Sequence, residues 1–202
     1  MEPSSLTVTG RRRTAALAGH LGDEAAARAA LSDPAASVRV TALGALDRLG
    51  ALTGGDLCSA LVDPAPAVRR RGCELAGTSP GVDISAGLHD VDSSVVEMAA
   101  WSMGERGERA SVPALSALAS AESGHSDPLC REAAVAALGA IGDPAGLPAI
   151  LAALEDKPAI RRRAAVALAA FEGPSVEAAL RRCLEDRDWQ VRQVAEDLLA
   201  LE

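Results

Sequence analysis

Aromatic residues are almost missing from this sequence. Its 202 residues include one Phe, two Trp and no Tyr, although 49% of them are hydrophobic. A buried core must therefore consist of Leu, Ala, Val and Ile, whose small side chains suit helices packed with their backbones close together. The shortage also argues against enzymes that extrude a nucleic-acid base and hold it among aromatic rings.

Positive charge is also scarce. Twenty Lys and Arg residues face 28 Asp and Glu residues, so the formal net charge is −8, and Lys157 is the only lysine. An acidic chain is not attracted to phosphate backbones or anionic lipids, which argues against nucleic acid as a partner. The preference for Arg over Lys indicates a GC-rich genome, such as that of an actinobacterium, and hence a bacterial protein.

Long apolar runs are absent as well. No segment approaches the roughly 18 apolar residues that cross a bilayer, so we expect no membrane insertion. The triplet Arg11–Arg13 precedes an Ala- and Leu-rich stretch, but His20 and Asp23 interrupt that stretch too early for a secretion signal. The sequence therefore predicts a cytoplasmic protein.

No pattern of metal ligands or catalytic residues is present. The four cysteines, Cys58, Cys73, Cys130 and Cys183, form no CxxC pair and are expected to be small buried apolar residues. The three histidines fall at unrelated positions, and neither a catalytic triad nor a Gly-rich phosphate loop occurs. We therefore predict a protein that is not an enzyme and has no catalytic site, metal or cofactor.

One phrase recurs through the chain. It consists of Leu, two residues, Pro or a substitute, a short gap, and then a Val-Arg pair that opens an Ala- and Leu-rich segment, as in 31–39 and 61–69. The Arg position recurs every 27 to 35 residues, at Arg39, Arg69, Val96, Arg131, Arg161 and Arg192. A period near 30 residues with two helical segments is typical of a helical solenoid. The fourth unit also contains an inserted loop at residues 120–126.

The second helix of each unit has an apolar face with helical spacing. Counting from the residue before the Arg, apolar residues return after 4, 7 or 8, and 11 positions, as in Ile160, Ala164, Leu168 and Phe171. The Asp before each second helix is expected to be its N-cap. Shorter first helices are expected at residues 56–62, 83–89, 112–119, 145–154 and 176–184.

These features predict an all-α protein. We expect about 13 helices in a right-handed α-α superhelix, a helical solenoid with about six helix pairs and an N-terminal partial repeat. Residues 10–202 are expected to form a single repeat domain, and residues 1–9 a flexible tail before it. No alternation of β-branched residues indicates strands.

Two segments, 33–44 and 128–142, carry a pattern close to Asp-Pro-x-x-x-Val-Arg-x-x-Ala-x-x-Ala-Leu-Gly. This pattern resembles the HEAT-like repeats first described in phycobilisome lyases, and the resemblance extends over residues 11–202. It implies the fold but leaves function open, because such arrays bind many partners. Two alternatives follow from proteins with this repeat: a bilin lyase or bilin chaperone, and a HEAT-like DNA glycosylase, which this acidic chain fits less well.

The face lined by the second helices is the expected binding surface, because solenoids usually bind partners along their concave side. Positions 2, 5, 6 and 9 after the residue that precedes the Arg point away from the buried stripe. They hold Arg70, Glu74, Glu97, Trp101, Glu132 and Arg162, with Glu196 and Asp197 on the last helix. We therefore expect an adaptor or scaffold that binds another protein, of unknown identity, along this face.

Two tryptophans have competing interpretations. Trp101 lies outside the predicted core stripe, so it is either an exposed anchor for a partner or a side chain that packs against the inserted loop or a neighbouring helix. Trp189 precedes the last second helix and is expected to cover the C-terminal end of the core.

The recurring Arg also has two interpretations. It forms either a basic stripe for an anionic partner or a structural ladder of bonds to the Asp residues between helices. The ladder is favoured because the Asp recurs with the Arg, at Asp33, Asp63, Asp156 and Asp186. A planar guanidinium suits such bridging.

Overall fold

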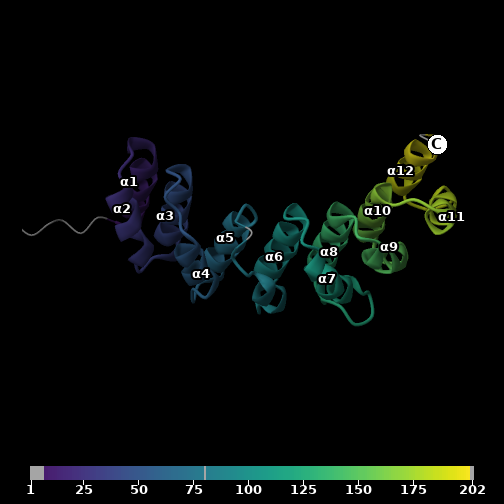
Figure 1. The fold of residues 1–202 in the computed structure, drawn as a ribbon, viewed down its shortest axis with the longest axis horizontal. Helices are drawn as coiled ribbons and strands as arrows, with labels where there is room; N and C mark the ends of the chain where they lie inside the picture. Colours follow the sequence, from purple (N-terminus) through teal and green to yellow (C-terminus); the bar gives the residue numbers. More distant parts are fainter. Residues whose placement is uncertain (1–6, 80, 201–202) are drawn as a thin grey trace, which may run out of the picture. The chain divides into compact units, whose positions relative to one another are not determined.

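The computed structural model describes residues 7–79 and 81–200, and all regular structure in them is helical (Figure 1). These residues form twelve α-helices and five short 3-10 segments, so the predicted all-α fold is confirmed. None of the helices in this part of the chain is long and apolar enough to cross a membrane. The chain divides into two compact units, Met1–Ile84 and Ser85–Glu202.

The first unit is built on three long helices and two short ones. They are α1 (Val8–Leu21), α2 (Glu24–Ala29), α3 (Ala36–Arg48), α4 (Gly54–Leu61) and α5 (Pro66–Ala76). The long helices lie side by side, since α3 packs against both α1 and α5. The short helix α4 packs against α5, while α2 packs against α1 and α3. Helix α1 therefore takes the place of a second helix in the N-terminal partial repeat.

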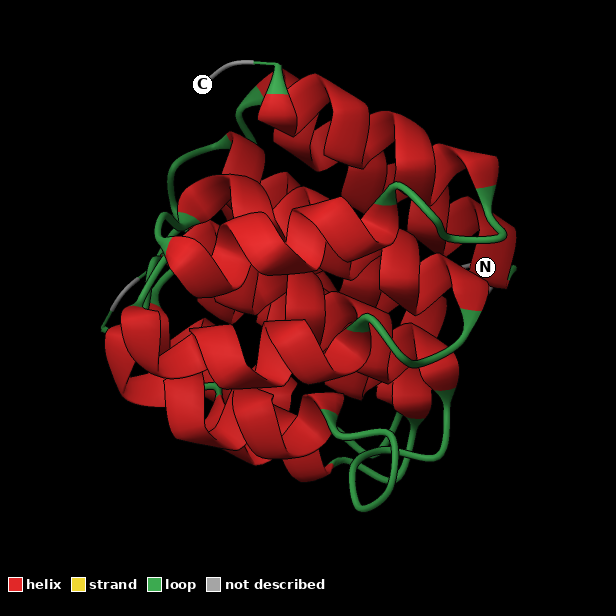
Figure 2. Ribbon diagram, turned by 90° about the vertical axis from the view of Figure 1, so that its right-hand side faces the viewer, coloured by secondary structure: helices red, strands yellow, loops and turns green. Residues whose placement is uncertain are grey.

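The second unit repeats this arrangement. Its second helices are α6 (Ser93–Glu105), α8 (Pro128–Ile141), α10 (Pro158–Ala167) and α12 (Trp189–Leu199), and each contacts the next one. Its first helices are α7 (Val112–Ala119), α9 (Leu147–Ala153) and α11 (Pro174–Cys183), and each packs against the second helix of its own pair. Loops and turns join all of these helices (Figure 2). The predicted bounds of residues 112–119 are confirmed.

Two expected first helices differ from the prediction. Ser85–His89, within the helix expected at 83–89, forms a 3-10 segment (η2) rather than an α-helix. Gly87 lies in the middle of this short segment, and glycine costs about 1 kcal/mol in a helix interior. Likewise, Pro144–Gly146 forms a 3-10 turn (η4) before α9, so the helix expected at 145–154 is shorter.

The predicted apolar stripe of the second helices is buried. Ile160 and Ala164 of α10 have no exposed surface, and Leu168 is 1% exposed. Only Phe171, at the end of the stripe, is partly exposed, because the helix has already ended there. Burying a Leu or Ile side chain contributes about 1.5–3 kcal/mol to the free energy of unfolding, so this stripe supplies much of the core.

Successive second helices approach each other through a Gly facing an Ala. A Cβ added to Gly104 would lie 2.8 Å from the Cα of Ala137 on the next second helix. The same close approach occurs in three pairs: Gly19–Ala45, Gly104–Ala137 and Gly139–Ala167. The scarcity of large side chains in the sequence thus has a structural counterpart, because these helices pack nearly backbone to backbone.

Part of the expected N-terminal tail is helical. Thr7 caps α1 by accepting a hydrogen bond from the Gly10 amide at 3.2 Å, and Val8 begins the helix. Residues 1–6 of the expected tail lie outside the described residues. The single repeat domain expected at residues 10–202, and the right-handed superhelix, stay predictions.

Two side chains expected to be covered are exposed. Cys58 points outward from α4 beside the buried Leu57, whereas the other three cysteines are buried as predicted. Trp189 is 64% exposed, so the prediction that it covers the core is wrong. It is the first residue of α12, two positions before Val191 begins the buried stripe.

Candidate partner-binding face

The Arg that opens a second helix binds two repeats at once. Arg39 donates hydrogen bonds from Nε and Nη2 to the two carboxylate oxygens of Asp63, at 2.8 and 2.6 Å. Its Nη1 also donates to the backbone oxygen of Asp33 at 2.8 Å. Arg39 therefore ties the loop before its own helix to the Asp before the next second helix.

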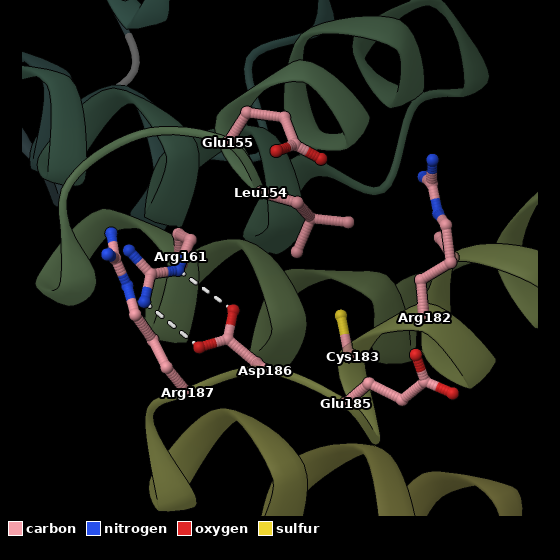
Figure 3. Close-up of a pocket in the computed structure, with 9 residues that line it drawn as sticks. Leu154, Glu155, Arg161, Arg182, Cys183, Glu185, Asp186 and Arg187 are labelled. Carbon is pink, nitrogen blue, oxygen red and sulfur yellow. Dashed lines mark hydrogen bonds and ion pairs between the residues drawn. The ribbon is translucent and has the colours of Figure 1, made fainter.

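This contact recurs as a series that we call the arginine ladder. Its rungs are Arg11–Asp33, Arg39–Asp63, Arg131–Asp156 and Arg161–Asp186, with Nε–Oδ2 distances of 2.7–2.9 Å. Figure 3 shows the last rung, with both of its hydrogen bonds. The ladder interpretation is confirmed, and these arginines are bound to carboxylates rather than offered to an anionic partner.

The ladder keeps its carboxylates ionised. Hydrogen bonds from Arg131 lower the pKa of Asp156 against the opposing effect of burial, and Arg161 lowers the pKa of Asp186 in the same way. The Arg131–Asp156 rung is the most enclosed, with side chains 7% and 5% exposed. A buried ion pair adds little net stability, but removing one partner leaves a charge that is costly to bury.

The ladder aspartates are not the helix caps that the sequence predicted. Asp33 lies two residues before the N-cap position of α3, where its Oδ1 accepts a hydrogen bond from the Ala35 amide at 2.8 Å. Capping belongs to a second set, Asp92, Asp127 and Asp188, which accept from the amides of residues 94, 129 and 190. The expectation holds for Asp127. It is wrong for Asp33, Asp63, Asp156 and Asp186, because those carboxylates face the Arg of the preceding repeat.

One rung is missing between α6 and α8, and both of its halves are replaced. Val96 stands in the Arg position and is fully buried. His125 stands in the Asp position, six residues before Arg131, as Asp33 stands before Arg39. Its Nδ1 accepts from the Asp127 amide at 3.0 Å, and its backbone oxygen accepts from Arg131 Nη1 at 2.7 Å. The inserted loop, residues 120–126, is thus held by the Arg that opens α8.

A pocket of about 310 Å³ lies beside the last rung (Figure 3). Glu155, Arg182 and Cys183 line it together with the Arg161–Asp186 pair. Arg161 is already bound, and burial raises the pKa of the Cys183 thiol, which lowers its reactivity. Cys130 is similar, since burial raises the pKa of its thiol to about 11. Neither thiol has the lowered pKa of a nucleophile.

The predicted face of the first unit contains a groove of about 780 Å³. Arg70 and Glu74, both predicted for this face, line it from α5. Arg71 forms an ion pair with Glu74 at 2.8 Å, and Arg70 lies 4.0 Å from the same carboxylate. The remaining lining comes from α1, α3 and α5: Ala16, His20, Val40, Thr41, Gly44, Asp47, Arg48 and Ala67.

The face of the second unit has a smaller groove of about 350 Å³. Glu132 and Arg162, also predicted, line it with Ala159, Arg163 and Val166. Both arginines are paired, since Arg163 contacts Glu132 at 3.4 Å and Arg162 contacts Asp188 at 3.5 Å.

The last two predicted residues lie one turn apart on α6. Trp101 is 45% exposed, so part of its surface is accessible to a partner, and Glu97 is half-buried. The six predicted residues thus form three local pairs: Arg70 with Glu74, Glu97 with Trp101, and Glu132 with Arg162. Glu196 and Asp197 are exposed on α12.

Most of the residues that line the groove of the first unit were not predicted from the sequence. Val40, Gly44 and Asp47 on α3 occupy the same positions, 2, 6 and 9 after Val38, that defined the face elsewhere. The predicted residues were charged or aromatic side chains of α5, α6, α8, α10 and α12, and none of them came from α3. Applying the spacing rule to every second helix would have found them.

A comparison with protein families shows which family the chain belongs to. A family model described as HEAT repeats matches residues 83–161 and 120–200, which together span more than half of the sequence. The chain belongs to the HEAT-repeat family. No curated protein matches it. Among the residues that the structure describes, this HEAT-repeat protein has no group of three or more His, Cys, Asp or Glu side chains that could hold a metal ion.

Three solved structures illustrate the similarity. The Escherichia coli protein YibA is 18% identical, with a TM-score of 0.64 over 99% of this chain and 77% of that chain. The complex of CpcE and CpcF of phycocyanin lyase from Nostoc sp. PCC7120 is 26% identical, with a TM-score of 0.60 over 87% and 75%. Human deoxyhypusine hydroxylase is 20% identical, with a TM-score of 0.50 over 98% and 81%. The first and third of these show a shared fold alone.

Proposed function

We propose that this HEAT-repeat protein is a non-enzymatic adaptor or scaffold that binds another protein along the face of its second helices. The observation that carries the proposal is Trp101, which is 45% exposed beside Glu97 on that face. In a chain with two tryptophans, an outward Trp is a strong candidate for an anchor, because Trp and Arg dominate the binding energy of protein interfaces.

The grooves on the same face support a protein partner over a small molecule. Charged side chains such as Arg70, Glu132 and Arg162 line them, whereas small-molecule pockets are mostly apolar. The CpcE–CpcF structure, which is similar to this chain, is itself a complex of two proteins. Long charged side chains, in a protein that also exposes Trp101, are typical of surfaces that bind another protein.

Affinity purification from the native cells tests the proposal. Wild-type protein is compared with a triple variant, Arg70→Glu, Glu97→Lys and Trp101→Ala. We expect one protein to be recovered in near-stoichiometric amounts with the wild type and lost with the variant. All three side chains are at least partly exposed, so the melting temperature should change little.

A matched control carries the same kinds of change outside the predicted face. It combines Arg109→Glu, Glu122→Lys and Val62→Ala, all at exposed positions in first helices and loops. Retention of the partner by this control would support the proposed face. Recovery of the same proteins with both triple variants, or of none with the wild type, would contradict it.

A bilin lyase or bilin chaperone is the second candidate, and the observation that favours it is the 26% identity to the CpcE–CpcF complex of phycocyanin lyase. Binding of a bilin to a protein surface changes its absorption spectrum. An absorbance titration with a linear tetrapyrrole that shows no spectral shift would reject this candidate. The third activity considered, a DNA glycosylase, gains no support, because no aromatic side chain lines either groove in the described part of the chain.

A further inference from the structure

We infer that the groove of the first unit binds an acidic segment of the partner protein. This inference rests on the proposed adaptor function and adds the chemistry of what the groove holds. The groove runs across α1, α3 and α5, and basic side chains enter it from at least two of these helices: Arg48 from α3, and Arg70 and Arg71 from α5.

The positive charge of the groove is only partly compensated. Glu74 is shared between Arg70 and Arg71, so one carboxylate serves two guanidinium groups. Arg48 is exposed and forms no ion pair within residues 7–79 and 81–200, although Asp47 lies next to it in the chain. None of these three arginines belongs to the ladder, and together they face two carboxylates of the groove lining, Glu74 and Asp47, which leaves an excess of positive charge.

Helix α1 extends this positive surface. Arg12 precedes Ala16 by four residues and Arg13 precedes it by three, and Ala16 lines the groove. Residues three and four apart lie on the same helix face, so both arginines continue the groove toward the start of α1. Both are exposed and make no ion pair among the described residues.

The floor of the groove suits a peptide chain. Ala16, Val40, Gly44 and Ala67 are small or apolar, and a Cβ added to Gly44 would meet first the Arg71 guanidinium, at 3.1 Å. Three neighbouring helices with axes about 8–10 Å apart span about 16–20 Å. An extended chain rises about 3.3 Å per residue, so the groove accommodates five or six residues.

The distribution of charge along the chain separates this groove from the rest of the molecule. Residues 1–84 contain nine Arg and nine Asp or Glu, which balance, so the whole net charge of −8 falls on residues 85–202. In the second unit, Arg162 and Arg163 are both paired with carboxylates. A positive groove in an otherwise acidic protein favours an acidic ligand at this one place.

Nucleic acid fits the groove less well than an acidic peptide. Residues 1–84 contain no aromatic residue, and proteins that bind single strands stack the bases on aromatic side chains. The acidic remainder of the chain also repels a long polyanion. A short peptide bearing Glu or Asp meets neither obstacle.

Methyl NMR of the full-length protein tests the inference. The probes are a hexapeptide of alternating Glu and Ala, its counterpart with Lys in place of Glu, and a six-nucleotide thymidine strand. The acidic peptide should shift the methyl signals of Ala16, Val40 and Ala67, and leave those of Ala159 and Val166 unchanged. The Lys peptide should shift none of them, and the response should weaken as salt is raised.

Variants separate charge from packing. Arg48→Glu with Arg70→Glu should weaken peptide binding at least tenfold, whereas Arg48→Lys with Arg70→Lys should retain most of it. The control Arg109→Glu with Arg181→Glu, at exposed positions of the second unit outside the proposed face, should bind as the wild type does. If the first pair lowers the melting temperature, Arg48→Gln with Arg70→Gln replaces it.

Several results would overturn the inference: no shifts at the three methyl groups at low salt, equal shifts with the Glu and Lys peptides, or stronger binding of the thymidine strand. Partner capture separates its failure from that of the adaptor function. A partner lost by Trp101→Ala but retained by Arg48→Glu with Arg70→Glu would refute the acidic groove alone.

Discussion

The Arg131–Asp156 rung illustrates what a single side chain does in this protein. Both side chains are nearly enclosed, and the carboxylate accepts two guanidinium hydrogen bonds while Oδ1 also accepts from the Lys157 amide at 2.7 Å. The pair joins the loop before α8 to the loop before α10. Its importance therefore lies in holding two repeats in register as well as in its electrostatic energy.

Removing half of this rung should destabilise the protein. Asp156→Ala leaves the Arg131 guanidinium buried without a carboxylate, and we expect the free energy of unfolding to fall by about 3 kcal/mol in urea denaturation. Replacing both partners, as Arg131→Met with Asp156→Leu, should recover much of the loss. Asp33→Ala should cost less, because Arg11 is 32% exposed and water can solvate it. Equal losses for Asp156→Ala and Asp33→Ala would contradict this account.

Acid should weaken the fold through the same carboxylates. Hydrogen bonds from Arg131 hold the pKa of Asp156 below its ordinary value of 3.8. A carboxylate with a lowered pKa in the folded state contributes stability that is present above its unfolded-state pKa and is lost as the pH falls through its folded-state value. The urea midpoint should therefore decline below a pH of about 4, and decline less in Arg131→Met with Asp156→Leu. Parallel declines in the two proteins would show that this rung plays no part.

At the scale of helices, the contact between Gly and Ala sets the distance between successive second helices. Gly104→Ala would place a Cβ 2.8 Å from the Ala137 Cα, so α6 and α8 would have to move apart. We expect a loss of about 1–3 kcal/mol in the free energy of unfolding, despite the better helix propensity of Ala. The matched control is Gly44→Ala, whose nearest neighbour is the flexible end of Arg71 at 3.1 Å. A melting temperature lowered more by the control than by Gly104→Ala would refute the argument.

The second helices could be predicted well from the sequence, and the segments between them less well. A stripe such as Ile160, Ala164 and Leu168 repeats with the helical period, so burial followed from spacing alone. Short segments carry no such period, which is why a helix was expected at residues 83–89 where only Ser85–His89 forms a 3-10 segment around Gly87. Trp189 was predicted wrongly because it lies two positions before Val191, where the buried stripe of α12 begins.

The arginine ladder and its missing rung between α6 and α8 were also only partly predictable from the sequence. Recurrence of Arg with Asp predicted the rungs, yet not that each Asp belongs to the following repeat. His125 could not be recognised as an Asp substitute, because the inserted loop shifts the spacing on which the comparison relied. Of the candidate face, the spacing rule found Arg70 and Glu74 but not Arg48, which lies ten positions after Val38 and so outside the positions that the rule selects.

Across the whole molecule, the two units present different surfaces to a partner. The first offers a positive groove around Arg48 and Arg70, and the second offers Trp101 with an acidic balance of charge. An adaptor that uses both would lose affinity in steps, so Trp101→Ala and the Arg48→Glu, Arg70→Glu pair should each weaken capture of the partner and together abolish it. Loss of both contacts need not lower the melting temperature, because all three side chains are exposed.

The arginine ladder also bears on how such a protein can lengthen. Every rung takes its guanidinium from one repeat and its carboxylate from the next, and the two residues are 22 to 25 positions apart in the chain. Duplication of one full period within the gene would bring a new donor and a new acceptor together at both junctions without any further substitution. A duplication of any other length would leave a guanidinium facing the wrong residue, so arrays of this kind should grow by whole repeats.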